Sequence, residues 1–280
     1  MDFYHFRIQF GPDFPSTVSK SRYRVRMTVD RSLYAMTFVT LPEWPCPTCG
    51  KGHLKSSKGS ILNADTGPSK AAREQDPSWE PEDSEARFAG LLTCDFANCG
   101  EIVAVLGDVY VFEYHDYDED GQLTQGYGDR FRPRSLSPAP LPIRPPEETP
   151  ALVTGALREA AGLLWQSAEG AANQIRQAVE HLMDEQGVTK AVAPAFKSLH
   201  SRIEEFKLTD PTNAEILLAI KWLGNSGSHA GGLTRTDVFD AFDFIEHALV
   251  NLYDTTTAEL IAKARAINTQ KGPVKPPSFS

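Results

Sequence analysis

The amino-acid sequence predicts an α+β protein, with a β-rich amino-terminal part and an antiparallel α-helical bundle in the carboxy-terminal part. Two observations predict this class. Short segments before about residue 115 alternate apolar and polar residues, as half-buried strands do, whereas beyond residue 150 apolar residues recur at helical spacing. Seven prolines between Phe131 and Pro150 separate the two patterns and favour an extended, semi-rigid connector.

These patterns divide the chain into five parts. They are a β-strand segment (1–40), a four-cysteine ribbon with a long polar insertion (41–132), a proline-rich linker (133–150), a helical bundle (151–268) and a tail expected to be disordered (269–280). Within the first part, alternation at residues 6–10 and again at 23–29 predicts two strands. Residues 101–106 and 109–114 predict two further strands, and the polar stretch 55–87 is expected to be a mobile excursion.

The composition limits the classes of function. A net charge of −9 argues against a surface built to coat nucleic acid, because neutralising phosphates requires clustered Lys and Arg. No apolar run has the length of a membrane span, and the first residues lack the pattern of a signal peptide. We therefore expect a cytoplasmic protein without a membrane partner.

Four cysteines occur in two close pairs, Cys46 with Cys49 and Cys94 with Cys99. A short turn between paired cysteines directs two thiolates to one point, and the glycine after each pair permits that turn. Two such knuckles complete a tetrahedral site, and four thiolates leave no open position for water. The pattern predicts a structural Zn²⁺ rather than a catalytic one. His53 is an alternative fourth ligand.

Five helices are predicted in the bundle. Their apolar stripes lie in residues 152–168, 171–183, 199–206, 211–223 and 236–252. The fourth stripe ends in the segment Lys221-Trp222-Leu223-Gly224-Asn225, which places a cation and an amide beside a glycine. Trp222 is expected in the core, and Asn225 after Gly224 suits a left-handed helix terminus.

The chain resembles the domain of unknown function 4145 family over roughly residues 41–54 and 88–254. The resemblance rests on the cysteine pairs, the proline-rich connector, Arg176-Gln177-Ala178-Val179-Glu180, and Leu223-Gly224-Asn225-Ser226-Gly227-Ser228-His229. That family is regarded as a branch of the HEPN superfamily of helical domains, which often dimerise and occur in toxins, antiviral defence and restriction loci. The resemblance implies a HEPN-like bundle and a homodimer.

Catalytic HEPN domains are metal-independent endoribonucleases that use an Arg and a His at the dimer cleft. In this sequence Lys221 stands in place of that Arg, and residues 222–228 separate it from His229, a longer spacing than in the motif. The resemblance implies His229 as acid or base, Lys221 or Arg176 as the cation that stabilises the phosphate, and Asn225 as an orienting residue. Lysine offers a point charge where arginine binds phosphate at two points, which weakens the case for catalysis.

The same residues have structural interpretations. His229 can cap a helix end or hydrogen-bond to Arg176 and Glu180, and these two residues, four apart, can form an ordinary helix-surface pair. Between residues 150 and 254, eight Lys or Arg stand against fourteen Asp or Glu, a poor surface for binding RNA.

Two functions therefore stay open. The first is a non-catalytic or regulated dimerisation or docking module of a prokaryotic defence or nucleic-acid-processing system, with RNA or a defence-system protein as partner. The second is an endoribonuclease or toxin in which His229 acts with Lys221 or Arg176.

Overall fold

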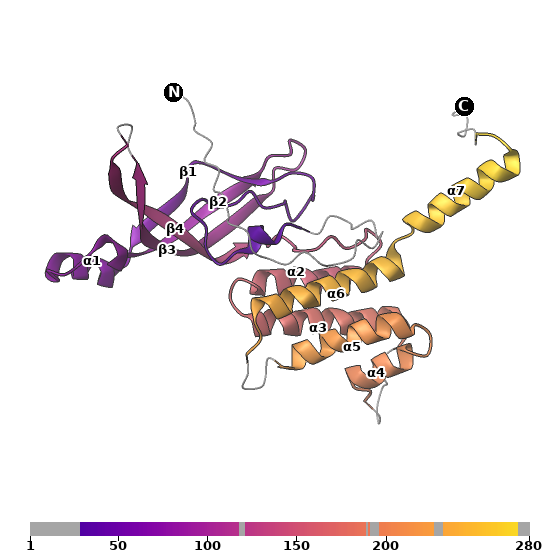
Figure 1. The fold of residues 1–280 in the computed structure, drawn as a ribbon. Coiled ribbons are helices and arrows are strands. Elements are labelled where there is room, and N and C mark those ends of the chain that lie inside the picture. The colour runs from indigo at the N-terminus through magenta and orange to yellow at the C-terminus, as the bar shows by residue number, and fades with distance from the viewer. Residues whose placement is uncertain (1–28, 118–120, 189, 191–195, 227–231, 274–280) are drawn as a thin grey trace.

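A computed structural model describes residues 29–117, 121–188, 190, 196–226 and 232–273. Within these ranges a twisted antiparallel sheet lies beside a bundle of helices, so the predicted α+β class is confirmed (Figure 1). The strands predicted at 6–10 and 23–29 fall largely outside the described residues, as does most of the predicted tail. None of the helices in the described ranges has the length and apolar character of a membrane-spanning segment.

The sheet consists of four strands in the order β1-β2-β3-β4. They are β1 (Leu54–Asp65), β2 (Glu85–Cys94), β3 (Ile102–Tyr117) and β4 (Leu123–Ser137). Alternate residues of β2 and β3 are buried, including Phe88, Val103 and Val105, as expected where one face of a sheet covers a core. Helix α1 (Gly67–Gln75) and the short 3₁₀ helix η2 (Pro81–Asp83) connect β1 to β2.

The prediction that residues 55–87 form a mobile polar excursion is wrong. Most of β1, all of α1 and the start of β2 lie in this stretch. Strand β1 is an edge strand in which Leu54 alone is fully buried, so its sequence carries no alternation, and backbone pairing with β2 holds it in place. The start of α1 is fixed by Thr66, whose side chain accepts a hydrogen bond from the backbone N–H of Ser69.

The two strands predicted at 101–106 and 109–114 form one continuous strand, β3. Gly107-Asp108 resembles a turn in the sequence, but the register of β3 against β4 shifts at Leu106/Gly107 and the strand continues. The buried carboxylate of Asp108 forms two ion pairs, with Arg134 (Nε to Oδ2, 2.7 Å) and with Arg87 (Nε to Oδ1, 3.2 Å). The linker also starts later than predicted, because β4 extends to Ser137.

The five predicted helices are present in the bundle. They are α2 (Ala151–Leu163), α3 (Ala168–Glu185), α4 (Leu199–Phe206), α5 (Pro211–Ser226) and α6 (Arg235–Tyr253). Helix α3 packs against α2, α5 and α6, and α4 packs on α5. The predicted stripe of α3 is buried throughout, including Ile175, Val179 and Leu182, which places this helix at the centre of the bundle core.

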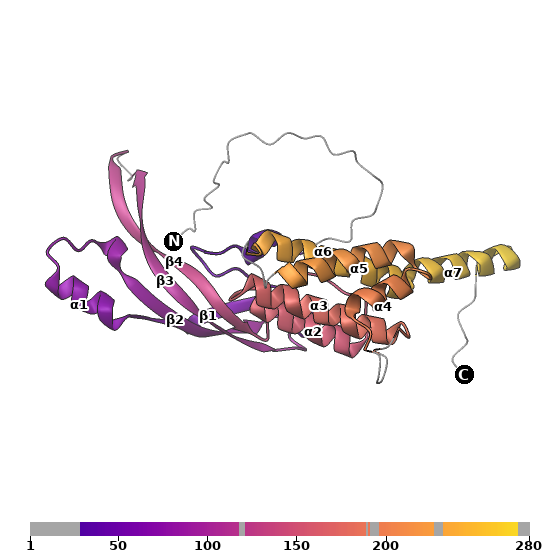
Figure 2. The same cartoon turned by 90° about the horizontal axis from the view of Figure 1, so that it is seen from below.

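Helix α5 continues past its predicted end at Leu223 and runs to Ser226. Gly224 and Asn225 are therefore helical residues, and Asn225 is not the left-handed terminus predicted for it, since Lys271 is the one non-glycine residue with positive φ in the described ranges. A further helix, α7 (Thr256–Gln270), had no counterpart among the predicted helices. It projects from the bundle in two perpendicular views (Figures 1 and 2).

Aromatic side chains join the sheet part to the bundle. Tyr34, at the end of the 3₁₀ helix η1 (Arg31–Tyr34), stacks on Trp165 with ring centroids 5.8 Å apart, and Trp44 meets the same indole edge-on at 5.8 Å. Arg235 of α6 donates a hydrogen bond to the Tyr34 carbonyl oxygen at 2.8 Å. All three aromatic residues are buried, so the two parts share one continuous core.

Candidate metal centre and bundle groove

The four cysteines converge on one point. Their sulfur atoms all lie within 4.8 Å of one another, with Cys46 and Cys99 at 3.8 Å and Cys49 and Cys94 at 3.7 Å. A tetrahedral ion with metal–sulfur bonds of about 2.3 Å would set its ligand sulfurs about 3.8 Å apart. The donor set therefore fits a metal ion, as the cysteine spacing predicted.

Each knuckle has the predicted turn. Gly50 follows Cys49 with φ +61°, and Gly100 follows Cys99 with φ +62°, a left-handed conformation that glycine adopts without strain. The backbone N–H of Gly50 donates to the Cys46 carbonyl oxygen at 3.0 Å, which closes the first turn. The first knuckle precedes β1, and Cys94 and Cys99 span the end of β2 and the approach to β3, so sheet pairing brings the two knuckles together.

Backbone donors and burial act differently on the thiols. The N–H groups of Gly52 and Lys51 point at the Cys49 sulfur, at 3.4 and 3.5 Å, and lower the pKa of this thiol to about 6. Burial raises the pKa of Cys94 to about 12. A bound cation would favour the thiolate form at every position.

Gly52 is a residue of this centre that the sequence analysis missed. A Cβ atom there would lie 2.6 Å from the Cys94 sulfur and 2.7 Å from the Phe96 Cβ. The close approach of backbone to thiol is visible only once both knuckles are placed in space. His53, the alternative ligand, is exposed and lies outside the sulfur cluster, while its backbone N–H donates to Asp95 at 2.8 Å.

A second site is a groove of about 330 Å³ where α3, α4 and α5 meet. It is lined by Arg176, Ser198, Leu199, His200, Lys221 and Asn225. Three of these six, Arg176, Lys221 and Asn225, were predicted from the sequence. The structure therefore brings together three of the five candidate bundle residues, with Glu180 one helical turn beyond Arg176 on α3.

The arginine of the groove is already paired. Its Nη1 donates to Glu180 Oε1 at 2.5 Å and its Nε to Asn173 Oδ1 at 3.2 Å, so the predicted pair four residues apart is confirmed. Lys190 binds the other oxygen of Glu180 at 2.5 Å. Burial alone would raise the pKa of Glu180, but Lys190 and Arg176 together lower it, which keeps the carboxylate ionised.

The lysine of the groove lies over an aromatic ring. Lys221 Nζ is 3.2 Å from the centroid of the Trp222 ring, and the Trp222 and His200 rings are 6.0 Å apart. Trp222 is 54% exposed, so the prediction that it lies in the core is wrong. Ile220, two residues earlier in α5, is buried instead. Two residues along a helix rotate the side-chain direction by about 200°, so Trp222 lies on the surface, where its ring is near His200 of α4.

His200 was missed by the sequence analysis. Ser198 caps α4 by accepting a hydrogen bond from the Ser201 N–H at 3.2 Å, and this cap places His200 in the first helical turn. The place of His200 in the groove with Lys221 depends on the packing of α4 on α5, which the local sequence does not indicate. The predicted catalytic His229 lies outside the described residues.

Two family models match the chain. Residues 158–270 match the family described as domain of unknown function (DUF4145), which confirms the resemblance predicted from the sequence for the bundle. Residues 35–136 match a second family, domain of unknown function (DUF8608), and both cysteine pairs, which the predicted resemblance also included, lie within that match. No curated protein and no solved structure matches the chain significantly.

Proposed function

We propose that this protein is a zinc-bearing docking module whose HEPN-like bundle pairs with a second copy of the chain. In this proposal the module serves a prokaryotic defence or nucleic-acid-processing system and acts in the cytoplasm. The proposed defence or nucleic-acid-processing role rests on the resemblance of the bundle to HEPN domains. The proposed metal site rests on the four-cysteine cluster. Zinc is the ion proposed because four thiolates at tetrahedral spacing are its usual structural ligand set.

The docking role rests on one observation: both cations of the groove already have partners. Arg176 is bound by Glu180 and Asn173, and Lys221 lies over the Trp222 ring. A phosphate would have to compete with these contacts, since Arg176 would exchange a short ion pair for a new one. Engaged cations favour a structural groove over one poised to bind the RNA backbone.

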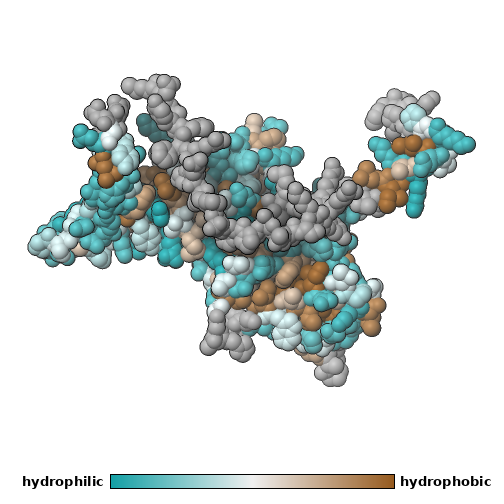
Figure 3. Space-filling view, viewed as in Figure 1, coloured by the Kyte–Doolittle hydropathy of each residue, from teal (hydrophilic) through white to brown (hydrophobic). Residues whose placement is uncertain are grey.

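Two exposed aromatic side chains close to the groove support pairing with a second copy. Trp222 is 54% exposed, and Phe196, two residues before the groove residue Ser198, is 74% exposed. Large aromatic side chains of this kind are enriched in the centres of protein interfaces. Figure 3 shows further apolar side chains on the bundle surface and along α7.

Light scattering on the zinc-loaded chain tests this proposal. We expect a dimer at micromolar concentration and a shift to monomer in Trp222→Glu, which places a charge in the interface. Leu62→Glu is the matched control, because Leu62 is also exposed, at 71%, but lies on β1. A wild-type monomer, or equal dimerisation in both variants, would refute pairing through this rim.

The second candidate function is RNA cleavage. It is favoured by the convergence of Arg176, Lys221 and Asn225 on one groove, with the imidazole of His200 beside them. In this function Lys221 or Arg176 would stabilise the charge on phosphorus, and His229 would move the proton of the attacking hydroxyl.

Incubation with single-stranded RNA in EDTA separates the two functions. The docking role predicts no cleavage above a buffer control. The enzyme role predicts cleavage that Lys221→Ala and His229→Ala each abolish while Lys207→Ala, on the exposed end of α4, leaves it intact. Cleavage that survives His229→Ala but not His200→Ala would move the acid or base to His200.

A further inference from the structure

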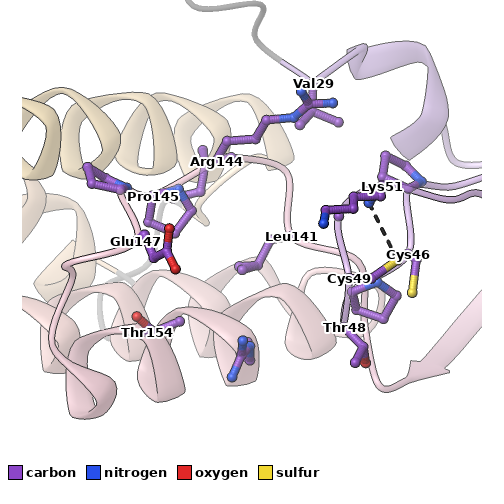
Figure 4. A pocket seen from close by; sticks show the side chains of 16 residues that line it. Val29, Cys46, Thr48, Cys49, Lys51, Leu141, Arg144, Pro145, Glu147 and Thr154 are labelled. Atoms are coloured by element: carbon purple, nitrogen blue, oxygen red, sulfur yellow. Dashed lines mark hydrogen bonds between the residues drawn. The ribbon is translucent and has the colours of Figure 1, made fainter. Parts of the chain in front are cut away.

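A larger pocket lies between the first cysteine knuckle, the proline-rich linker and the first bundle helix (Figure 4). Its volume is about 600 Å³, within the range typical of sites for small molecules. The walls come from three segments distant in sequence: the knuckle at 45–51, the linker at 141–147, and α2 through Thr154 and Arg158. None of the functions considered above uses this pocket.

Three cations, one from each segment, line the pocket. They are Lys51 of the knuckle, Arg144 of the linker and Arg158 of α2, against the single carboxylate of Glu147. Within the described part of the chain, no ion pair or side-chain hydrogen bond involves these three cationic groups, and Lys51 Nζ lies 5.8 Å from the centroid of the Phe96 ring. In Figure 4, Lys51 points into the space above Leu141, and Arg144 extends along the rim towards Val29.

All three side chains are exposed, and together with the single Glu147 they give the pocket lining a net positive charge. This arrangement contrasts with the bundle groove, where Arg176 is held by Glu180. This net positive lining would attract an anion. An arginine guanidinium can donate two parallel hydrogen bonds to two oxygens of a phosphate. A phosphate monoester carries close to two negative charges.

The remaining lining suits an organic group attached to that anion. Leu141, Ile143 and Pro145 form an apolar side, and the hydroxyls of Thr48 and Thr154 can donate or accept hydrogen bonds. Flat apolar rings can pack against proline and aliphatic surfaces, while the polar groups orient the ligand. The lining thus has one cationic and one apolar portion.

We propose that this pocket binds a phosphate-bearing small molecule of mononucleotide size, with the phosphate on the cationic portion that Lys51 and Arg158 line and that Arg144 borders at the rim. A small ligand is favoured over an RNA strand because the three cations line one pocket, and because the chain carries a net charge of −9. A ligand here would contact the metal knuckle, the linker and the bundle at once.

Isothermal titration calorimetry on the zinc-loaded full chain tests the proposal. The probes are AMP, ADP, ATP, inorganic phosphate and a short single-stranded RNA. We expect at least one mononucleotide to bind with a Kd below about 1 mM, and Arg158→Ala to weaken it by about tenfold or more. Arg158→Lys keeps the positive charge but cannot make the two parallel hydrogen bonds of arginine, so its affinity should lie between those of the wild type and Arg158→Ala.

Lys58→Ala and Arg265→Ala are the matched controls, because each removes one exposed cation far from the pocket, on β1 and α7. Both should bind like the wild type. Arg158 is exposed, so its replacement should leave the circular dichroism and zinc content unchanged. The proposal is overturned if no mononucleotide binds, if RNA alone binds, or if Arg158→Ala and the controls bind equally.

Discussion

Gly224 of α5 lies directly against Arg176 of α3: a Cβ atom at position 224 would be 2.7 Å from the Cβ of Arg176 and 3.1 Å from the Ala172 carbonyl oxygen. Glycine is unfavourable inside a helix by about 1 kcal/mol relative to alanine. Here it permits α5 to approach α3 closely, and that approach places Lys221 and Asn225 beside Arg176 in one groove.

Gly224→Ala should lower the free energy of unfolding by about 1 kcal/mol or more, because overpacking against the Arg176 Cβ and the α3 backbone outweighs the gain in helix propensity. Urea unfolding followed by circular dichroism measures the change. Gly155→Ala is the matched control, since a Cβ atom there meets nothing within 4 Å and should stabilise α2. Equal stabilisation by both variants would show that α5 does not need this contact.

Gly52→Ala should weaken metal binding, because its Cβ would lie 2.6 Å from the Cys94 sulfur. Groups that support metal ligands typically change affinity by about 10-fold to 100-fold when altered. Transfer of zinc to a chromophoric chelator reports the effect. Gly67→Ala, at an open position at the start of α1, should retain zinc as the wild type does.

Glu180→Gln should destabilise the bundle at neutral pH, by about 1 kcal/mol, because Arg176 and Lys190 lose their shared carboxylate. Burial opposes ionisation of Glu180, but the two cations hold its pKa below the ordinary value of about 4.5. A lowered native pKa means that the stabilisation is present above about pH 4.5 and is lost as the pH falls through the native value.

The difference in unfolding free energy between wild type and Glu180→Gln should therefore be constant near neutral pH and shrink in acid. Denaturant unfolding at a series of pH values measures it. Glu204→Gln serves as control, because the Glu204 carboxylate is exposed and its ion pair is long, with Oε2 3.9 Å from Lys207 Nζ. A Glu180→Gln difference that grows in acid would contradict the lowered pKa.

Arg202→Ala should lower the free energy of unfolding by about 3 kcal/mol. The Arg202 side chain is fully buried and binds Asp184 Oδ1 at 2.5 Å, the Val188 carbonyl oxygen at 2.7 Å and the Glu180 carbonyl oxygen at 3.2 Å. It thereby ties α4 to the end of α3. Lys207→Ala, which removes an exposed cation from the same region, should change stability by less than about 0.5 kcal/mol in the same urea titration.

The cysteine cluster was predictable from the sequence because each knuckle is specified by residues close together in the chain. Two cysteines three or five residues apart, each pair followed by a glycine, already specify a knuckle, and Gly50 and Gly100 adopt the left-handed conformation that this requires. Gly52 was not predictable in this way, since its role depends on the sulfur of Cys94 from the other knuckle.

The bundle was predictable in outline for a similar reason. Helical spacing identified the buried stripe of α3, but it could not fix which face of α5 meets a neighbour. Trp222 was expected inside and is 54% exposed, while Gly224 was expected to end the helix and packs within it. Strand β1 escaped prediction because an exposed edge strand carries no alternating pattern and is held by the backbone of β2.

Native mass spectrometry of the purified chain measures metal content and oligomeric state together, so it tests the proposed zinc site and the proposed dimer in one experiment. A zinc-bearing docking module predicts a dimer that carries one zinc ion per chain, because four thiolates fill one tetrahedral site. A folded, metal-free monomer would contradict both the zinc site and the dimer.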